Sequence, residues 1–374
     1  MVESSSGPSE APPVVHQAVD PSPRENLLGL PRSQLASKLE SLVDRPYRAR
    51  QIYEALYARG ISGFDEMTDL PAELRRRLVE AFRIEPPAEV RGTESADGTR
   101  KVLLRLADGA TVEAVDIPDR SRRTLCLSSQ AGCALACAFC VTGFWGAGRN
   151  LTAGEIVGQV LALRRGETPP FEGLNLVFMG MGEPLHNLPA LRDAIEILAE
   201  RISWRRITVS TAGVVPGIVE LATWPKRPNL AISLHAPDDE RRSRLMPINR
   251  THPLDELLAA LADYPLERGR RLTVEYLMIR DFNDALGDAE ALSRRLRGLV
   301  AKVNLIPINA DPVLGERMVP PDDATVTAFQ NRLRDLGWIA TVRRRRGDDV
   351  SGACGQLRSP DKQPRGFRRS NLSF

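Results

Sequence analysis

The sequence predicts an α/β protein in which helices cover a parallel β-sheet. Two observations predict this class. From residue 124 onward, short β-rich runs alternate with amphipathic helical stretches six times, and polar groups follow five of the six runs. Such alternation is typical of a doubly wound sheet or of a partial barrel. In both architectures the loops at the carboxyl ends of the strands carry the chemistry.

The composition is that of an ordinary folded protein. Hydrophobic residues make up 42% and charged residues 26% of the 374 residues, and 28 Gly with 28 Pro exclude a collagen-like chain. No apolar run approaches the ~18 residues of a membrane span, and the first residues, MVESSSGPSE, lack the pattern of a secretory signal. We therefore expect a cytoplasmic protein without membrane contact. The net charge of +3 is too small to indicate a nucleic-acid partner by itself.

The N-terminal part divides into a leader and a helical domain. Residues 1–23 are rich in Ser and Pro and show no apolar periodicity, so we expect a disordered leader. Residues 24–85 show helical periodicity, with Gly60 after one helix and Pro71 at the start of another. The three helical segments are SQLASKLESLV, YRARQIYEALYARG and PAELRRRLVEAF.

The remaining elements follow in three parts. Residues 86–120 contain the alternating segments VRGTES, RKVLLRL and TVEAVDIP with Asp-Gly turns, so we expect an antiparallel β extension. Residues 121–350 hold the six β/α units, and residues 351–374 form a C-terminal segment with a basic tail. The expected strands are TLCLSSQ, LNLVFMG, RITVSTAG, NLAISLHA, RLTVEYLMI and KVNLIPIN, and the expected helices are TAGEIVGQVLALRRG, LPALRDAIEILAER, GIVELATW, PLDELLAALADY, DALGDAEALSRRLRG and DDATVTAFQNRLRDLG.

Polar groups mark the ends of the expected parallel strands. A cysteine loop follows the first strand, Gly182-Glu183 the second, and Ser210, His235 and Asn309 end others. Because such ends meet at one edge of a parallel sheet, we expect these residues to surround one site. Taken singly, His235 also fits a structural imidazole, Cys126 a small apolar core residue, and Glu113 a solvated strand position.

The five cysteines predict metal or redox chemistry. Four lie within fifteen positions, at 126, 133, 137 and 140, and the fifth is Cys354, which is not the pattern of a secreted disulfide scaffold. Cys133-x3-Cys137-x2-Cys140 supplies three thiolates, one fewer than a closed zinc site or a fully ligated cluster needs. A fourth ligand would complete a zinc site. Without one, a four-iron cluster keeps an open iron that can bind the amino and carboxylate groups of S-adenosylmethionine.

The C-x3-C-x2-C spacing, with Phe139 before the last cysteine, resembles the signature of the radical S-adenosylmethionine superfamily, which uses a [4Fe-4S] cluster. Within it the chain resembles, from about residue 25 to 360, the dual-specificity adenine carbon-2 methyltransferases of bacterial 23S ribosomal RNA and transfer RNA. The resemblance implies a partial (β/α)6 TIM-like barrel of the radical S-adenosylmethionine type. It also implies an RNA-binding role for the N-terminal helical domain. It is carried by VEAVDIP, TLCLSSQAGCALACAFC, GRNLTAGEIVGQV, MGMGEPLHN, TVSTAGVVP, AISLHAP, VNLIPIN and RRRRGDDVSGACGQL.

The resemblance also implies a role for each matching position. The methyl-carrying cysteine falls on Cys354, the second redox cysteine on Cys126, and the proton-accepting glutamate on Glu113. VTGFWGAG after the cluster is more aromatic than the family pattern, which bears on how the target loop fits. The cluster ligands fall on Cys133, Cys137 and Cys140, and the cofactor-binding residues on Gly182, Glu183, Ser210, Ser233, Leu234, His235 and Asn309.

The implied reaction uses two S-adenosylmethionine molecules per turnover. The first methylates Cys354, and the radical from the second activates that methyl group for addition to adenine. Cys126 then attacks the Cys354 sulfur to release the product, which leaves a disulfide. The implied partners are 23S rRNA and tRNA, an electron donor such as flavodoxin, and a disulfide reductant, and we expect a monomer.

Two other functions fit the same residues. An adenine carbon-8 rRNA methyltransferase of the same mechanism would share the cysteine set, and a non-catalytic zinc-stabilised RNA-binding protein would use the cysteines as ligands only. Basic segments at 201–206 and 343–346 predict phosphate contacts, although each taken alone also fits solvated surface charge.

Overall fold

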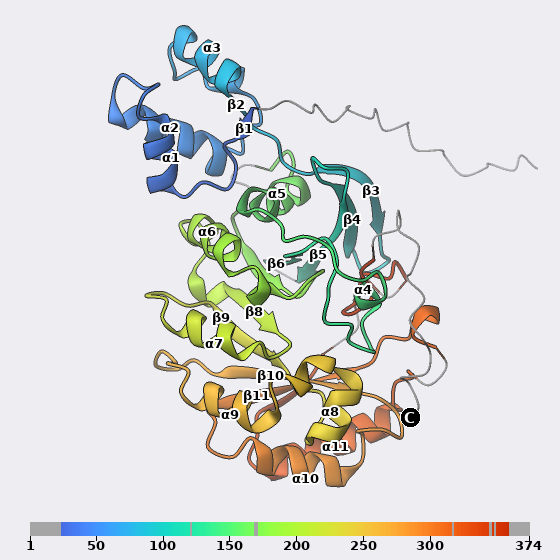
Figure 1. Cartoon of the computed structure of the whole chain (residues 1–374). Coiled ribbons are helices and arrows are strands. Elements are labelled where there is room, and N and C mark those ends of the chain that lie inside the picture. Colours follow the sequence, from blue (N-terminus) through green and yellow to red (C-terminus); the bar gives the residue numbers. More distant parts are fainter. Residues whose placement is uncertain are drawn as a thin grey trace, which may run out of the picture.

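The structure is a computed structural model that describes residues 24–119, 122–167, 171–315, 318–343, 346–347 and 349–358. The expected disordered leader (residues 1–23) and the part of the basic tail beyond residue 358 lie outside the described residues. Figure 1 shows a group of N-terminal helices at one end of a curved sheet, with further helices along the outer side of that sheet.

The N-terminal unit consists of three helices, α1 (Arg32–Leu39), α2 (Pro46–Tyr57) and α3 (Ala72–Ala81). Two short strands, β1 (Glu25–Asn26) and β2 (Phe82–Arg83), pair in parallel and join the beginning of the unit to its end. Proline opens α2 and directly precedes α3, as expected where a helix begins.

The N-terminal unit packs closely on helix α5 (Ala153–Leu163). A Cβ on Gly29 would lie 2.0 Å from the backbone nitrogen of Gly154, so the two backbones touch only because both residues are glycine. Arg32 of α1 also forms an ion pair of 2.7 Å with Glu200, which follows helix α6. These contacts fix the helical unit against the helices that cover the sheet.

One ten-stranded sheet runs through the rest of the molecule in the order β12-β11-β10-β9-β8-β7-β6-β5-β4-β3. Strands β3 to β6 pair antiparallel and strands β6 to β12 pair parallel, so the β extension and the β/α units share one sheet. The strands are β3 (Ala88–Glu94), β4 (Arg100–Arg105), β5 (Thr111–Asp119), β6 (Arg122–Cys126), β7 (Leu174–Phe178), β8 (Ile207–Thr211), β9 (Asn229–Ser233), β10 (Leu272–Met278), β11 (Ala301–Pro307) and β12 (Ala340–Val342).

The strand order decides between the two expected architectures. A doubly wound sheet reverses its order at a switch point, whereas these parallel strands follow one another in sequence order. The predicted partial barrel is therefore confirmed, and it is open because β3 and β12 end the sheet. A seventh parallel strand, β12, was not predicted, because it is only three residues long and leads into the arginine run.

Helices lie on both sides of the parallel strands. The six expected helices line the outer side of the sheet in Figure 1: α5, α6 (Leu188–Ala199), α7 (Val215–Ala222), α9 (Leu254–Ala262), α10 (Leu286–Arg295) and α11 (Asp323–Asp335). Two short helices that were not predicted, α4 (Val141–Phe144) and α8 (Asp239–Leu245), lie on the opposite side. Single turns of 3-10 helix are η1 (Phe64–Glu66), η2 (Pro184–His186), η3 (Trp204–Arg206), η4 (Pro247–Arg250) and η5 (Pro312–Leu314). None of the described helices is both long and apolar enough to cross a bilayer.

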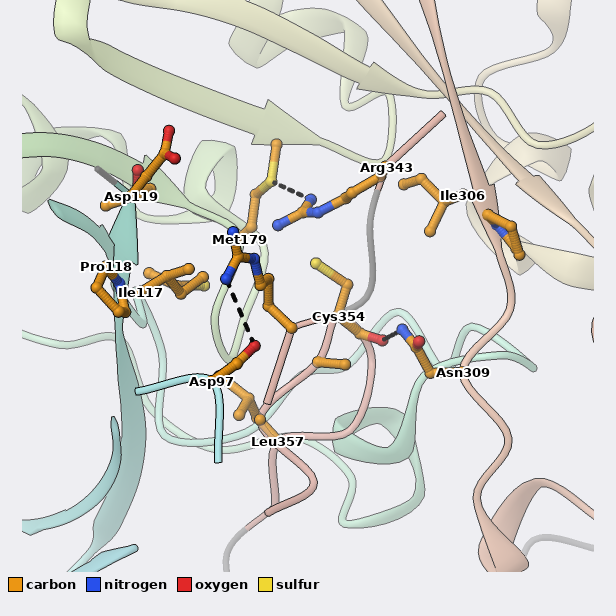
Figure 2. Close-up of a pocket in the computed structure, with 16 residues that line it drawn as sticks. Asp97, Ile117, Pro118, Asp119, Met179, Ile306, Asn309, Arg343, Cys354 and Leu357 are labelled. Carbon is orange, nitrogen blue, oxygen red and sulfur yellow. Dashed lines mark hydrogen bonds and ion pairs between the residues drawn. The ribbon is translucent and has the colours of Figure 1, made fainter. Parts of the chain in front are cut away.

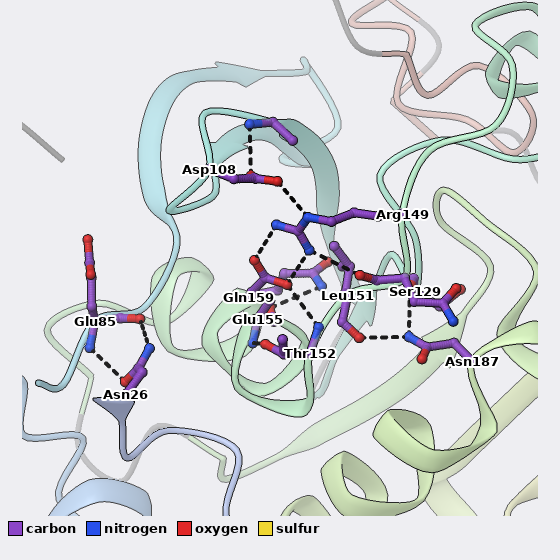
Figure 3. A network of polar contacts seen from close by, with 12 residues as sticks. Asn26, Glu85, Asp108, Ser129, Arg149, Leu151, Thr152, Glu155, Gln159 and Asn187 are labelled. Carbon is purple, nitrogen blue, oxygen red and sulfur yellow. Dashed lines mark hydrogen bonds and ion pairs between the residues drawn. The ribbon is translucent and has the colours of Figure 1, made fainter. Parts of the chain in front are cut away.

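A polar network fixes the loop between the last expected cluster cysteine and α5 (Figure 3). Arg149 in this loop pairs with Asp108 in the β4–β5 turn (2.6 Å) and with Glu155 in α5 (2.7 Å). Glu155 also forms a capping box with Thr152 at the start of α5. The loop is thus attached both to the antiparallel strands and to a covering helix.

Candidate active site

The loop after β6 brings Cys133, Cys137 and Cys140 to one cavity of about 150 Å³, which we call the thiol cavity. The chain turns between the first two cysteines through Ala136, whose φ of 51° few residues other than glycine adopt. The backbone N–H of Ala138 donates a 2.8 Å hydrogen bond to the carbonyl of Leu245 in α8. The loop is therefore fixed between the sheet and α8.

The electrostatics of these thiols fit ligands of an iron–sulfur cluster. Burial raises the pKa of Cys133 to about 12 and also raises the pKa values of Cys137 and Cys140, so free thiols keep their protons until metal replaces them. Among the described residues, no three His, Cys, Asp or Glu side chains converge as ligands of one metal ion. Thiolates that bind separate irons of a cluster do not need to converge.

The turn after β7 places a carboxylate at the thiol cavity. A Cβ on Gly182, where φ is 97°, would lie 2.5 Å from the Cβ of Gln130, so glycine is required for this close approach. Glu183 is 3% exposed, and its carboxylate accepts hydrogen bonds from the backbone N–H groups of Leu185 (3.0 Å) and Ala212 (2.8 Å). Burial raises the pKa of Glu183. A ligand ammonium group would offset the cost of that buried charge.

Ser210 at the end of β8, Ser233 at the end of β9 and His235 also line the thiol cavity. The Nδ1 of His235 accepts a hydrogen bond of 3.0 Å from the backbone N–H of Leu277, which assigns the ring proton to Nε2. Burial and the nearby guanidinium of Arg242 lower the pKa of His235 to about 3. The imidazole is therefore neutral at pH 7.

Leu234 and Asn309 are not among the described residues that line the thiol cavity. Leu234 is 1% exposed and is not among the described side chains that line the thiol cavity; its backbone N–H donates to the carbonyl of Glu275. Asn309 lines a second cavity, where its Nδ2 donates to the carbonyl of Cys354 (3.2 Å). The buried Oδ1 of Asn309 has no hydrogen-bond partner in the described structure, so it can accept a hydrogen bond from a ligand.

The second cavity, of about 810 Å³, is lined by parts of β5, β6, β11 and the C-terminal segment, and we call it the large cavity (Figure 2). Cys126 and Cys354 both line it as free thiols. Burial and the neighbouring Cys354 raise the pKa of Cys126 to about 12, while the charge of Arg343 acts in the opposite direction. Cys354, Arg343, Met179 and Ile306 line the thiol cavity as well, so the two cavities share a wall.

The segment that carries Cys354 is attached to the carboxyl ends of the barrel. The backbone N–H of Val141, directly after the cysteine loop, donates to the carbonyl of Gly355 (2.6 Å). The Nε2 of Gln356 donates to the carbonyl of Ala310, beyond β11 (3.1 Å). The segment is thus held to two sides of the barrel mouth at once.

Glu113 lies on β5 against this segment. It is 3% exposed, forms an ion pair of 3.1 Å with Lys101, and accepts a hydrogen bond from the backbone N–H of Arg358 (2.8 Å). Burial raises its pKa, and Lys101 offsets part of that effect. Glu113 is not among the described lining residues of either cavity. It lies two residues along β5 from Val115, the residue that pairs with Cys126.

The basic segments are placed differently from one another. Arg201 forms an ion pair with Glu54 of α2. The side chain of Arg343 points into the cavities, where its Nη1 lies 3.6 Å from the Sδ of Met179 (Figure 2). Residues 344 and 345 lie outside the described structure, and phosphate contacts by these segments stay a prediction.

Two charged side chains near the site were not predicted. Glu275 of β10 is 5% exposed, lines the thiol cavity and accepts a hydrogen bond from Asn304 (2.7 Å). The sequence signal that could have identified Glu275 is that it is the single acid within the apolar strand Leu272–Met278. Arg242 of α8 is 0% exposed, and no signal separates it from the other arginines of that helix.

Comparison with known proteins agrees with this geometry. The family described as the radical SAM superfamily matches residues 127–289, and the family described as the ribosomal RNA large subunit methyltransferase N-terminal domain matches residues 25–84. A crystal structure of a radical SAM methyltransferase from Sphaerobacter thermophilus superposes with a TM-score of 0.83 at 44% identity and covers 90% of this chain and 99% of that chain. The fold and the cysteine loop are therefore those of a radical SAM enzyme.

Individual relatives show to which family within this superfamily the chain belongs. A protein of Anaeromyxobacter dehalogenans named dual-specificity RNA methyltransferase RlmN is 46% identical, with 89% of this chain and 91% of the relative covered. A protein of the same name from Halorhodospira halophila is 47% identical, with 88% and 92% covered. The chain belongs to the RlmN family of dual-specificity RNA methyltransferases.

Proposed function

We propose that the protein methylates carbon 2 of an adenine in 23S rRNA and in tRNA through an S-methylcysteine on Cys354. One observation carries this proposal: Cys354 lines both the thiol cavity and the large cavity, and Cys126 lines the large one. A methyl group that Cys354 receives in the thiol cavity can therefore be delivered in the large cavity, which Cys126 also lines. Carbon 2 of adenine is electron-poor, so a radical route is needed where polar transfer has no nucleophile.

The residues of the thiol cavity fit the cofactors of a radical SAM enzyme. Cys133, Cys137 and Cys140 would hold a [4Fe-4S] cluster, and Gly182, Glu183, Ser210, Ser233 and His235 would bind S-adenosylmethionine. Leu234 and Asn309, which do not line this cavity, would support the same site, Asn309 through its unpartnered Oδ1. When bound, the cluster would supply the electron that splits S-adenosylmethionine into methionine and a 5′-deoxyadenosyl radical, this radical would take a hydrogen atom from the Cys354 methyl group, and the cluster would take up the electron that is lost after addition to adenine. Two S-adenosylmethionine molecules are used per turnover, one for the methyl group and one for the radical.

The chain's own residues perform the remaining steps. The Cys354 thiolate first takes a methyl group from S-adenosylmethionine, forming a thioether and releasing S-adenosylhomocysteine. After addition to carbon 2 and loss of one electron, Glu113 accepts the carbon-2 proton, which requires its contacts with Lys101 and Arg358 to open. Cys126 then attacks the Cys354 sulfur, forming a disulfide as the carbon–sulfur bond breaks and the methyl group takes up a proton.

The proposed reaction needs one partner to reduce the cluster and another to reduce the disulfide. A small electron carrier of the flavodoxin type would reduce the cluster, and a cellular thiol reductant would reopen the Cys126–Cys354 disulfide. The N-terminal helical unit would contact RNA. The enzyme would act as a monomer in the cytoplasm, where thiols and ribosomal RNA are both available.

The two non-cluster cysteines provide the test. Cys126→Ala should accumulate a covalent protein–RNA adduct because the adduct forms but cannot be resolved, whereas Cys126→Ala/Cys354→Ala should form none. Mass spectrometry should place the linkage between Cys354 and adenine, and nucleoside analysis of the wild-type product should find 2-methyladenosine. A wild-type enzyme that methylates normally while Cys126→Ala gives no linkage would refute the mechanism, and 8-methyladenosine would refute the assigned carbon.

A further inference from the structure

Arg242 is a fully buried cation without a carboxylate bonded to it among the described residues. Its guanidinium donates to four uncharged oxygens: the carbonyls of Ala212 (2.7 Å), Ser233 (3.1 Å) and Leu234 (3.2 Å), and the side-chain oxygen of Asn249 (2.6 Å). Burial lowers its pKa to about 10, so it is still charged at pH 7. Burial of a charge without an opposite charge is strongly unfavourable.

The acid that acts on Arg242 electrostatically is engaged elsewhere. Asp239 accepts hydrogen bonds from the backbone N–H of Leu254 (2.8 Å) and from Asn249 (2.8 Å). The other group that favours the charged form of Arg242 is Cys137 in its thiolate form. A cluster bound at Cys137 would supply the negative charge that Arg242 lacks.

The hydrogen bonds of Arg242 join the strand ends that line the thiol cavity. Ser233 ends β9, and Ala212 directly follows β8. Ala212 is held from both sides, because its N–H binds the Glu183 carboxylate and its carbonyl binds Arg242. Arg242 does not itself line the cavity among the described residues, so it acts on a ligand through these neighbours.

The helix that carries Arg242 is also attached to the cysteine loop. The carbonyl of Leu245, three residues along α8, accepts the N–H of Ala138, which lies between Cys137 and Cys140. A cluster held by three thiolates brings negative charge into this apolar surrounding. The reduction potential of such a cluster depends on the net charge and the hydrogen bonds around it.

We propose that Arg242 is a positioning residue that ties the ends of β8 and β9 into the S-adenosylmethionine site and supplies a buried positive charge to the iron–sulfur cluster. The inference rests on the cluster assignment of the proposed function. Arg242 would make two contributions that can be separated. Its positioning effect depends on the four hydrogen bonds, and its electrostatic effect on the cluster depends only on the charge. Arg242→Lys keeps the charge and loses most of the bonds, whereas Arg242→Gln loses the charge.

The test uses anaerobically reconstituted full-length protein, with an electron-paramagnetic-resonance redox titration and equilibrium binding of S-adenosylmethionine. We expect Arg242→Gln to make the reduction equilibrium at least tenfold less favourable, a shift of about 59 mV to more negative potential for one electron. Arg242→Lys should keep the wild-type potential and bind S-adenosylmethionine at least tenfold more weakly.

Arg270 is the matched control. Its side chain is 9% exposed and donates to the carbonyl of Arg227 (2.8 Å) and the side chain of Asn229 (2.8 Å), at the opposite end of β9. Arg270→Gln likewise removes a guanidinium that bonds to β9, in this case at the end away from the cysteine loop. Unlike Arg242, Arg270 also lies 3.5 Å from a carboxylate oxygen of Glu267. We expect it to leave both the potential and S-adenosylmethionine binding at wild-type values.

Each outcome decides the proposal. Wild-type potential and binding in a cluster-loaded Arg242→Gln protein would overturn it, as would wild-type binding in Arg242→Lys. Unfolding of both Arg242 variants, measured by circular dichroism, would assign a purely structural role and also overturn it; loss of the cluster from folded variants but not from Arg270→Gln would support it. A wild-type protein that binds no iron would instead overturn the proposed function.

Discussion

Replacing His235 with Asn should remove a defined part of the protein's sensitivity to acid. His235 is 3% exposed, and its pKa is lowered from 6.5 to about 3 by burial and by Arg242. Between these pH values the unfolded chain binds a proton at this residue and the folded chain does not. The free energy of unfolding therefore falls as the solution is acidified through pH 6.5, and the loss continues until about pH 3.

The size of the effect follows from the two pKa values. At pH 5 the unfolded His235 lies about 1.5 pH units below its pKa, and at 1.36 kcal/mol per unit the loss relative to pH 7.5 is about 2 kcal/mol. His235→Asn lacks this proton site, so the difference in stability between wild type and variant should shrink by about 2 kcal/mol between pH 7.5 and pH 5. The ring contacts that the variant loses lower its free energy of unfolding by the same amount at both pH values, so they cancel in this comparison.

Asn is the appropriate replacement because His235 has a φ of 63°, a conformation that Asn adopts more readily than most residues. Its side-chain oxygen can also accept the N–H of Leu277. The assay is urea unfolding of the metal-free protein at both pH values, followed by fluorescence and circular dichroism, whose transitions must coincide. If the two proteins lose the same stability on acidification, His235 is not a buried neutral imidazole and the reasoning fails.

Three further predictions concern other parts of the molecule. Cys137→Ala should lose the iron content and the absorbance near 400 nm of the reconstituted protein, and a variant with about four irons per chain would refute the ligand assignment. Lys101→Met should lower the free energy of unfolding by about 3 to 5 kcal/mol because it leaves Glu113 buried without its partner, while Arg76→Met at an exposed pair should leave the urea midpoint unchanged. RNA affinity should fall with salt, with a log–log slope of about −0.7 to −0.9 per neutralised phosphate, and an affinity independent of salt would exclude phosphate contacts.

Local patterns in the sequence predicted the elements whose formation depends on local periodicity. The six alternating strands and the six covering helices were predicted because a buried strand or an amphipathic helix shows its pattern within its own residues. Helix α8 was missed because its residues, DERRSRL, are almost all polar. It is stabilised instead by the Asp238 cap at its start and by the four hydrogen bonds of the Arg242 guanidinium. Contacts of this kind produce no apolar periodicity within the residues of the helix itself.

The candidate site was predictable in its parts but not in its assembly. The strand-end rule and the cysteine spacing predicted the wall of the thiol cavity, including Glu183, Ser210 and His235. Nothing local in the sequence indicates that Cys354 lies between two cavities, because its neighbours there come from segments far apart in the chain. The burial of Glu113 beside Lys101 likewise depends on the pairing of β4 with β5.

The attachments of the Cys354 segment indicate which steps of the reaction need backbone motion. The carbonyl of Cys354 is held by Asn309, and the carbonyl of Gly355 is held by Val141, while the Cys354 side chain already lines both cavities. The Cys354 side chain is therefore exposed to both cavities while its backbone is held. Glu113 is different, because it is bound to the backbone of Arg358 and paired with Lys101. In the proposed mechanism, the methyl group can thus be received and delivered with the segment in place, whereas the proposed proton transfer to Glu113 requires this end of the segment to open.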